Sequence, residues 1–158
     1  MGAIFLGALA LGYERNGQTG EGLKVIDEAL VLAEKNEERF YEAELHRLKG
    51  ELTLQKSKPS LDQIMTSQDK SEDTSLRSLT PDPQAEAEAC FLKAIEISRK
   101  QHAKSLELRA TVSLARLWQR QGKKAEAHRI LSEVYNWFTE GFDTKDLQEA
   151  KVLIEELA

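Results

Sequence analysis

Six polar side chains at helical spacing are the residues of this chain best suited to bind a partner through directed interactions. Three belong to one predicted helix and three to a later one: Glu44, Arg47, Glu51, Arg109, Arg116 and Gln119. Carboxylate, guanidinium and amide groups hydrogen-bond directionally with peptide groups and opposite charges. All six fall off the apolar stripes of their helices, and those on the earlier helix should be exposed to water. The six therefore either line a polar, mixed-charge groove for a protein or peptide partner, or form ordinary solvated surface.

Residue types that carry catalysis or bind metals form no recognisable motif here. The nearest glycine cluster, Gly17 to Lys24, lacks the spacing of a phosphate-binding loop. Three histidines lie on separate predicted helices or turns, each without a second ligand four residues on: His46, His102 and His128. Cys90 has apolar neighbours, which favours a buried small hydrophobe over a reactive thiol. We therefore expect a protein that is not an enzyme and holds no cofactor or metal.

Aromatic residues gather towards the end of the chain. They are Trp118, Tyr135, Trp137 and Phe138. A platform for a peptide or a base is one interpretation. Packing between the fifth, sixth and last predicted helices is the other, and the helical spacing of these residues favours it.

Composition bounds the class of protein. With 158 residues, 41% of them hydrophobic and 31% charged, the chain fits one soluble globular domain over residues 1–158. A net charge of −5 with mixed signs along the chain argues against nucleic acid as a partner. A single cysteine allows no internal disulfide, which favours the cytoplasm. The apolar start is too short to span a membrane and lacks the positive charge of a signal peptide, so we expect no membrane partner.

Apolar periodicity predicts seven helices that position these side chains. Their ranges are 3–15, 19–35, 37–55, 83–101, 104–121, 123–138, and a last helix from 143 or 144 onwards. Asp82 can cap the fourth helix, and Pro83 suits its first position. The predicted core positions are Leu23, Ile26, Ala29, Leu30, Ala33, Tyr41, Leu45, Leu48, Leu52, Ala87, Phe91, Ala94, Ile95, Ser98, Leu106, Ala110, Leu114, Leu117, Ala127, Leu131, Val134, Leu147, Ala150, Ile154 and Leu157.

Two segments depart from the amphipathic pattern. The first predicted helix is apolar on every side, so we expect a second copy of the chain, or a further hairpin of a longer protein, to cover it. Its large apolar residues are Ile4, Phe5, Leu6, Leu9 and Leu11. Residues 56–83 hold all three prolines, six serines and three threonines without an apolar period. This composition predicts a disordered insertion.

Small residues recur at a fixed spacing between paired helices. Ala10 precedes Gly22, and Ala115 precedes Ala127, by 12 positions; in a third copy, Gly50 pairs with Ala87 across the insertion. Such ladders let two antiparallel helices approach closely. Their repetition predicts an all-α fold, an α-solenoid of about three helix hairpins with a C-terminal capping helix.

This pattern of small residues resembles the tetratricopeptide repeat. Gly or Ala occupies the eighth and twentieth positions of the repeat, and Ala occupies the twenty-seventh. The large aromatic residue of the fourth position is missing. Four longer runs, residues 41–52, 87–94, 105–118 and 137–144, resemble the C-terminal helical region of large bacterial regulators. Those regulators join an adenylate or guanylate cyclase-like or DNA-binding domain to a P-loop ATPase and tetratricopeptide-like repeats. The resemblance covers about residues 20–158 without the insertion.

The resemblance implies a non-catalytic, protein-interaction or regulatory module of a bacterial signal-transduction protein. The long insertion and the apolar start suggest a fragment, a truncated reading frame or a stand-alone descendant of such a regulator. The alternative is a small-molecule sensor whose ligand pocket lies between the repeat helices, the third and the fifth.

Overall fold

Helices are the only regular secondary structure in the described part of the chain. The computed structural model describes all residues except 1–2, 38 and 57–81, and it leaves out the side chains of residues 3–6, 14 and 40. The elements are α1 (Ala3–Arg15), α2 (Thr19–Lys35), the 3₁₀ turn η1 (Arg39–Tyr41), α3 (Glu42–Lys56), α5 (Pro83–Lys100), α6 (Lys104–Arg120), α7 (Lys124–Tyr135) and α8 (Lys145–Leu157). The predicted all-α class is confirmed.

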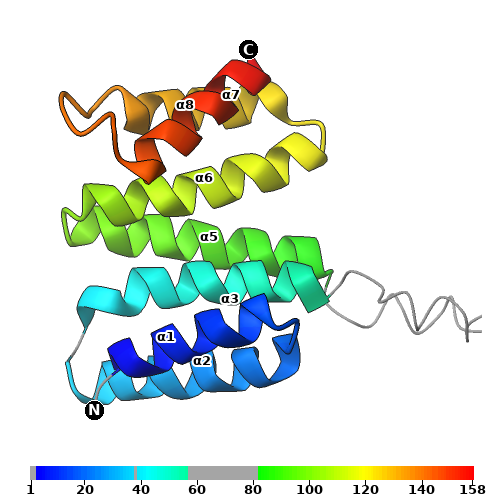
Figure 1. The fold of residues 1–158 in the computed structure, drawn as a ribbon, viewed down its shortest axis with the longest axis vertical. Helices are drawn as coiled ribbons and strands as arrows, with labels where there is room; N and C mark the ends of the chain where they lie inside the picture. Colours follow the sequence, from blue (N-terminus) through cyan, green and yellow to red (C-terminus); the bar gives the residue numbers. More distant parts are fainter. Residues whose placement is uncertain (1–2, 38, 57–81) are drawn as a thin grey trace, which may run out of the picture.

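The helices are stacked along the long axis of the molecule, from α1 and α2 at one end through α3, α5 and α6 to α7 and α8 at the other (Figure 1). The closest partners are α1 with α2, α3 with α5, and α6 with α7, which are the three predicted hairpins. Contacts of α2 with α3 and of α5 with α6 join one hairpin to the next, and α8 packs on both α6 and α7. The solenoid classification itself stays a prediction.

The helix ends agree with those predicted from capping and turn residues, with two exceptions. The Asp82 side chain accepts a hydrogen bond of 3.1 Å from the Gln84 backbone N–H, which confirms the predicted cap. The third helix does not begin at Glu37, because a φ of 58° there lies outside the right-handed helical region. The sixth helix ends at Tyr135, since Trp137 and Phe138 donate to carbonyls only three residues back.

The predicted insertion lies almost wholly outside the described residues. Lys56 is the last residue of α3, and Pro83 is the first of α5. Both ends of the predicted insertion are therefore held in helices that pack against each other.

Small residues mark the places where paired helices meet, as predicted. A Cβ added at Gly22 would lie 3.0 Å from Leu52 Cδ1 and 3.3 Å from Tyr13 Cβ. A Cβ added at Gly50 would lie 2.5 Å from Cε1 of Phe91. Ala115 and Ala127 are fully buried in the same apolar cluster.

Most of the predicted core positions are buried. The exceptions, which are half-buried, are Leu23, Leu30, Tyr41, Leu106 and Ile154. In their place Leu108 and Leu153 are buried in the cluster formed by α6, α7 and α8. Leu108 is buried because α6 packs against α3, α5, α7 and α8, so more than one of its faces is covered.

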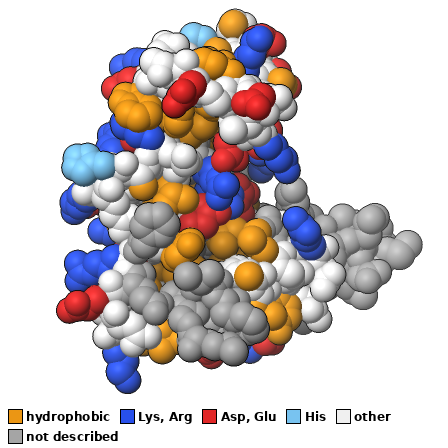
Figure 2. Space-filling model, turned by 60° about the vertical axis from the view of Figure 1, so that its left-hand side comes forward, with side chains coloured by type: hydrophobic (Ala, Val, Ile, Leu, Met, Phe, Trp, Pro, Cys, Tyr) orange, Lys and Arg blue, Asp and Glu red, His pale blue; other side chains and the backbone are white. Residues whose placement is uncertain are grey.

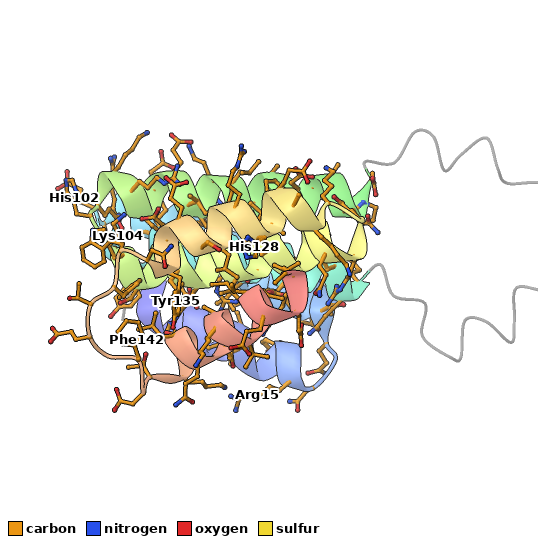
Figure 3. The ribbon with its side chains drawn as sticks, turned by 90° about the horizontal axis from the view of Figure 1, so that it is seen from above. Arg15, His102, Lys104, His128, Tyr135 and Phe142 are labelled. Carbon is orange, nitrogen blue, oxygen red and sulfur yellow. The ribbon has the colours of Figure 1, made fainter. Side chains whose placement is uncertain are left out.

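The aromatic residues are not all core residues. Trp118 packs against two apolar clusters, and its Nε1 donates to Glu88 Oε1 at 3.1 Å. Tyr135 and Phe138 pack against the α6–α8 cluster, and the ring of Tyr135 lies 5.8 Å from that of Phe142 (Figure 3). Trp137 is 58% exposed, so the prediction that it packs in the core is wrong.

The apolar first helix is covered in part. Ala10 is fully buried against α2 and α3, whereas Leu9 and Leu11 are exposed. The side chains of Ile4, Phe5 and Leu6 lie outside the described residues. Self-association through this helix stays a prediction.

Candidate partner-binding groove

Four of the six predicted site residues line one groove. Glu44 and Arg47 come from α3, and Arg109 and Arg116 come from α6. The groove has a volume of about 360 Å³ and includes residues from α1, α6 and α8 that were not predicted as site residues. These are Leu11, Arg15, Val112, Ser113, Lys145, Asp146 and Glu149. Figure 2 shows basic and acidic side chains next to one another on the face it presents, flanked by hydrophobic ones.

A chain of ion pairs connects three helices at one end of the groove. Arg47 donates to both carboxylate oxygens of Glu44, at 2.7 and 3.0 Å. Arg109 Nε donates to Asp146 Oδ2 at 2.9 Å, and its Nη1 lies 3.8 Å from Glu44 Oε1. Arg109 therefore links α3 to α8 across α6.

A second set of pairs lies at the other end. Arg116 Nη2 is 3.7 Å from Glu149 Oε2, and Lys145 Nζ is 3.7 Å from Glu149 Oε1. These separations exceed normal hydrogen-bond lengths, so both cations keep donors to offer to a partner.

The expectation that the charged residues of the earlier helix are exposed to water is wrong. The side chains of Glu44, Arg47 and Glu51 are only 16%, 18% and 28% exposed. They are covered because α6 lies against α3, a contact that the stripe of α3 alone does not reveal. Arg109 and Arg116 remain 45% and 46% exposed.

The two other predicted residues lie outside the groove lining. Glu51 Oε1 is 3.8 Å from Arg47 Nη1, which connects Glu51 to the groove. Gln119 is half-buried further along α6 and does not line the groove.

The charge of the groove is opposite to that of the whole chain. Its five cationic side chains are Arg15, Arg47, Arg109, Arg116 and Lys145, and they face the three carboxylates of Glu44, Asp146 and Glu149. The chain as a whole carries −5. A positive groove on an acidic protein favours acidic partners and raises their rate of encounter.

Other reactive side chains do not gather into a site in the described part of the chain. His102 and His128 lie apart in Figure 3, and no group of three or more His, Cys, Asp or Glu suited to a metal occurs among the described residues. Cys90 is half-buried rather than buried, and desolvation raises the pKa of its thiol, which disfavours a reactive thiolate.

No family model, curated protein or solved structure matches the chain. The likeness to tetratricopeptide repeats and to bacterial regulators thus stays an expectation drawn from its residues. None of the described helices combines the length and apolar character needed to cross a bilayer.

Proposed function

We propose that this chain is a non-catalytic interaction module of a cytoplasmic regulatory protein, and that its groove binds an acidic segment of a partner protein. The observation that carries the proposal is the surplus of cationic side chains where α1, α3, α6 and α8 meet. The resemblance to the helical ends of bacterial signalling regulators supports the same function.

The groove is better suited to binding than scattered surface charge would be. Arg109 and Arg116 are held by ion pairs that cross between helices, so little of their side-chain freedom is lost when a partner binds. Arg109 and Arg116 still expose guanidinium surface, which can contact carboxylates in a planar, directional way.

A small-molecule sensor is the second candidate, because the groove volume of about 360 Å³ is in the range of small ligand sites. In that case an anionic metabolite would occupy the space between α3 and α6. A metabolite that binds only the folded chain raises its thermal midpoint with concentration. A thermal-shift panel of anionic metabolites tests this alternative.

The proposal is tested with a fluorescent glutamate-rich octapeptide and the full chain. Arg116→Glu should weaken binding about tenfold, because it replaces attraction by repulsion at the groove. Arg120→Glu is the matched control: it makes the same charge change at an exposed site on the same helix, outside the groove lining. Equal weakening by both variants would mean that only net charge matters, and absence of binding to the unaltered chain would overturn the proposal.

A further inference from the structure

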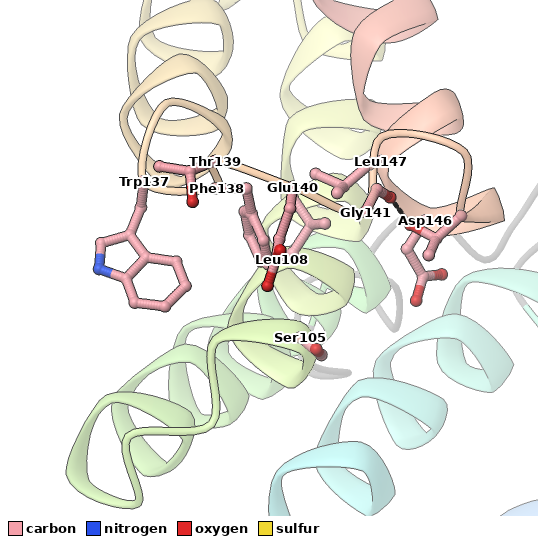
Figure 4. Close-up of a pocket in the computed structure, with 10 residues that line it drawn as sticks. Ser105, Leu108, Trp137, Phe138, Thr139, Glu140, Gly141, Asp146 and Leu147 are labelled. Carbon is pink, nitrogen blue, oxygen red and sulfur yellow. Dashed lines mark hydrogen bonds between the residues drawn. The ribbon is translucent and has the colours of Figure 1, made fainter.

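A second cleft adjoins the groove, beside the connection between α7 and α8. Its volume is about 590 Å³. The start of α6, the connection itself and the first turn of α8 contribute its walls (Figure 4). The residues that matter for its chemistry are Leu108, Trp137, Phe138, Glu140, Asp146 and Leu147.

One wall of the cleft is an exposed indole ring. Trp137 is packed edge-on against Phe138, with ring centroids 5.2 Å apart and planes at 86°. More than half of the Trp137 side chain nevertheless faces solvent. Lys104 Nζ lies 5.4 Å from the centroid of this ring, but Lys104 does not line the cleft; it lines a different pocket on which Trp137 also borders. Exposed indole faces are the strongest aromatic sites for cations.

The charged lining of the cleft is acidic, in contrast to the groove. Its charged residues are Glu140 and Asp146. Asp146 is bound to Arg109, whereas Glu140 has no ion pair with any residue in the described ranges. An apolar floor with a carboxylate and an indole face suits a cation carried on an apolar stem.

The cleft and the groove are neighbours that share one lining residue. Asp146 lines both, and successive turns of α6 face first the cleft, at Ser105 and Leu108, and then the groove, up to Arg116. The helix positions from Ser105 to Arg116 span roughly 16 Å at about 1.5 Å per residue. About five residues of extended chain cover this length.

We propose that the cleft binds a lysine or arginine side chain of the same partner segment whose acidic part occupies the groove. The stem packs on Leu108, Phe138 and Leu147, and the cationic head lies near Glu140 and the face of Trp137. The basic residue stands about five positions from the acidic ones. This inference rests on the proposed function, because the groove fixes where the acidic part lies.

The test uses three blocked, fluorescent peptides in anisotropy titrations with the full chain. Each carries two glutamates and, after four glycine or serine residues, one variable residue: arginine, its uncharged analogue citrulline, or leucine. Both chain directions are synthesised. The arginine peptide should bind about fivefold tighter than the citrulline peptide, because citrulline keeps the stem and loses the charge.

Two surface variants assign this gain to the cleft. Trp137→Ala and Glu140→Gln should each remove most of the advantage of arginine over citrulline. Glu155→Gln, at an exposed position on α8 away from the cleft, is the control for loss of one carboxylate. Glu140 lies on an exposed connection, so its replacement does not disturb the core.

The outcomes separate this inference from the proposed function. Equal affinity for arginine and citrulline peptides, or tightest binding of the leucine peptide, overturns the inference. If Arg116→Glu still weakens those peptides, the proposed function stands. If no peptide binds in either direction, both are overturned.

Discussion

Single residues decide how closely the helices of this protein approach. Glycine at position 50 brings α3 against the ring of Phe91, which is itself fully buried. Larger side chains at such positions have no space to enter, so these places set the geometry of each helix pair.

Gly50→Ala should therefore destabilise the protein. The new Cβ would lie within 3.0 Å of three atoms of the Phe91 ring, and overpacking of this kind costs about 1–3 kcal/mol. Urea unfolding followed by circular dichroism measures the change. Gly20→Ala is the control, since nothing lies within 4 Å of its new Cβ and stability should stay equal or rise. Equal effects of the two substitutions would contradict the packing argument.

His46 should make stability depend on pH. Burial lowers the pKa of this histidine from its usual value of 6.5; Glu42 opposes the shift, and Lys49 and Lys93 add to it. As pH falls below 6.5, the unfolded chain binds the proton first, so the free energy of unfolding decreases until the folded-state pKa is passed.

The measurement is the thermal midpoint from about pH 7.5 to about pH 5.5. His46→Gln should flatten the decline seen in the unaltered chain. His102→Asn, which removes an exposed histidine, should keep that decline. An identical pH profile of the thermal midpoint for the unaltered chain and for His46→Gln would show that His46 does not contribute to the pH dependence of stability.

Helix α6 joins the middle of the described fold to its C-terminal end. It contacts α3, α5, α7 and α8, and it supplies residues to the groove and to the cleft. Its first turn is tied to α5 by Glu107, whose buried carboxylate accepts from Arg99 Nε at 2.9 Å and from Lys104 Nζ at 3.0 Å.

Glu107→Gln should loosen this junction. The substitution keeps the shape of the side chain and removes the charge that holds two cations, so we expect a loss of about 1–2 kcal/mol in the free energy of unfolding. Glu21→Gln, in the exposed pair with Lys24, should cost much less. Equal losses in the free energy of unfolding at the two sites would mean that the burial of Glu107 does not increase its contribution to stability.

Helices were easier to predict from sequence than the contacts between distant elements. Caps, turn glycines and the small-residue ladder act within one or two helices, so they are visible in a short stretch of chain. The burial of Glu44 depends on α6, which lies far along the sequence, and so it was missed. Trp137 was misjudged because the chain leaves the α-helix at Tyr135, after which helical spacing says nothing about burial.

The groove was predicted only in part for the same reason. Arg47, Arg109 and Arg116 could be found from their positions off the apolar stripes. Arg15 joins them because α1 packs on α3, and Asp146 joins them because α8 packs on α6; no single-helix pattern encodes either contact.

At the scale of the whole molecule, the two ends differ in character. The α1 end exposes Leu9 and Leu11, whereas the α6–α8 end carries the cleft with Trp137. The groove lies where α1, α3, α6 and α8 meet. Leu11 also lines the groove, so self-association at α1 and partner binding at the groove would share part of one surface, whereas the cleft lies apart from α1.

Self-association is expected through α1. Light scattering should give an average mass that rises with concentration, because burial of exposed apolar side chains between two copies is favourable. Leu9→Lys should hold the chain as a monomer, whereas Val31→Lys, an exposed apolar site on α2, should not. A strict monomer at every concentration would rule this expectation out.

The most direct measurement of the central claim is an amide NMR titration of the full chain with the glutamate-rich peptide. If the groove binds acidic segments, shift changes will concentrate at Arg109, Val112, Ser113, Arg116 and Glu149. They will be absent in Arg116→Glu. Changes spread evenly over exposed lysines and arginines, or no changes at all, would contradict the claim.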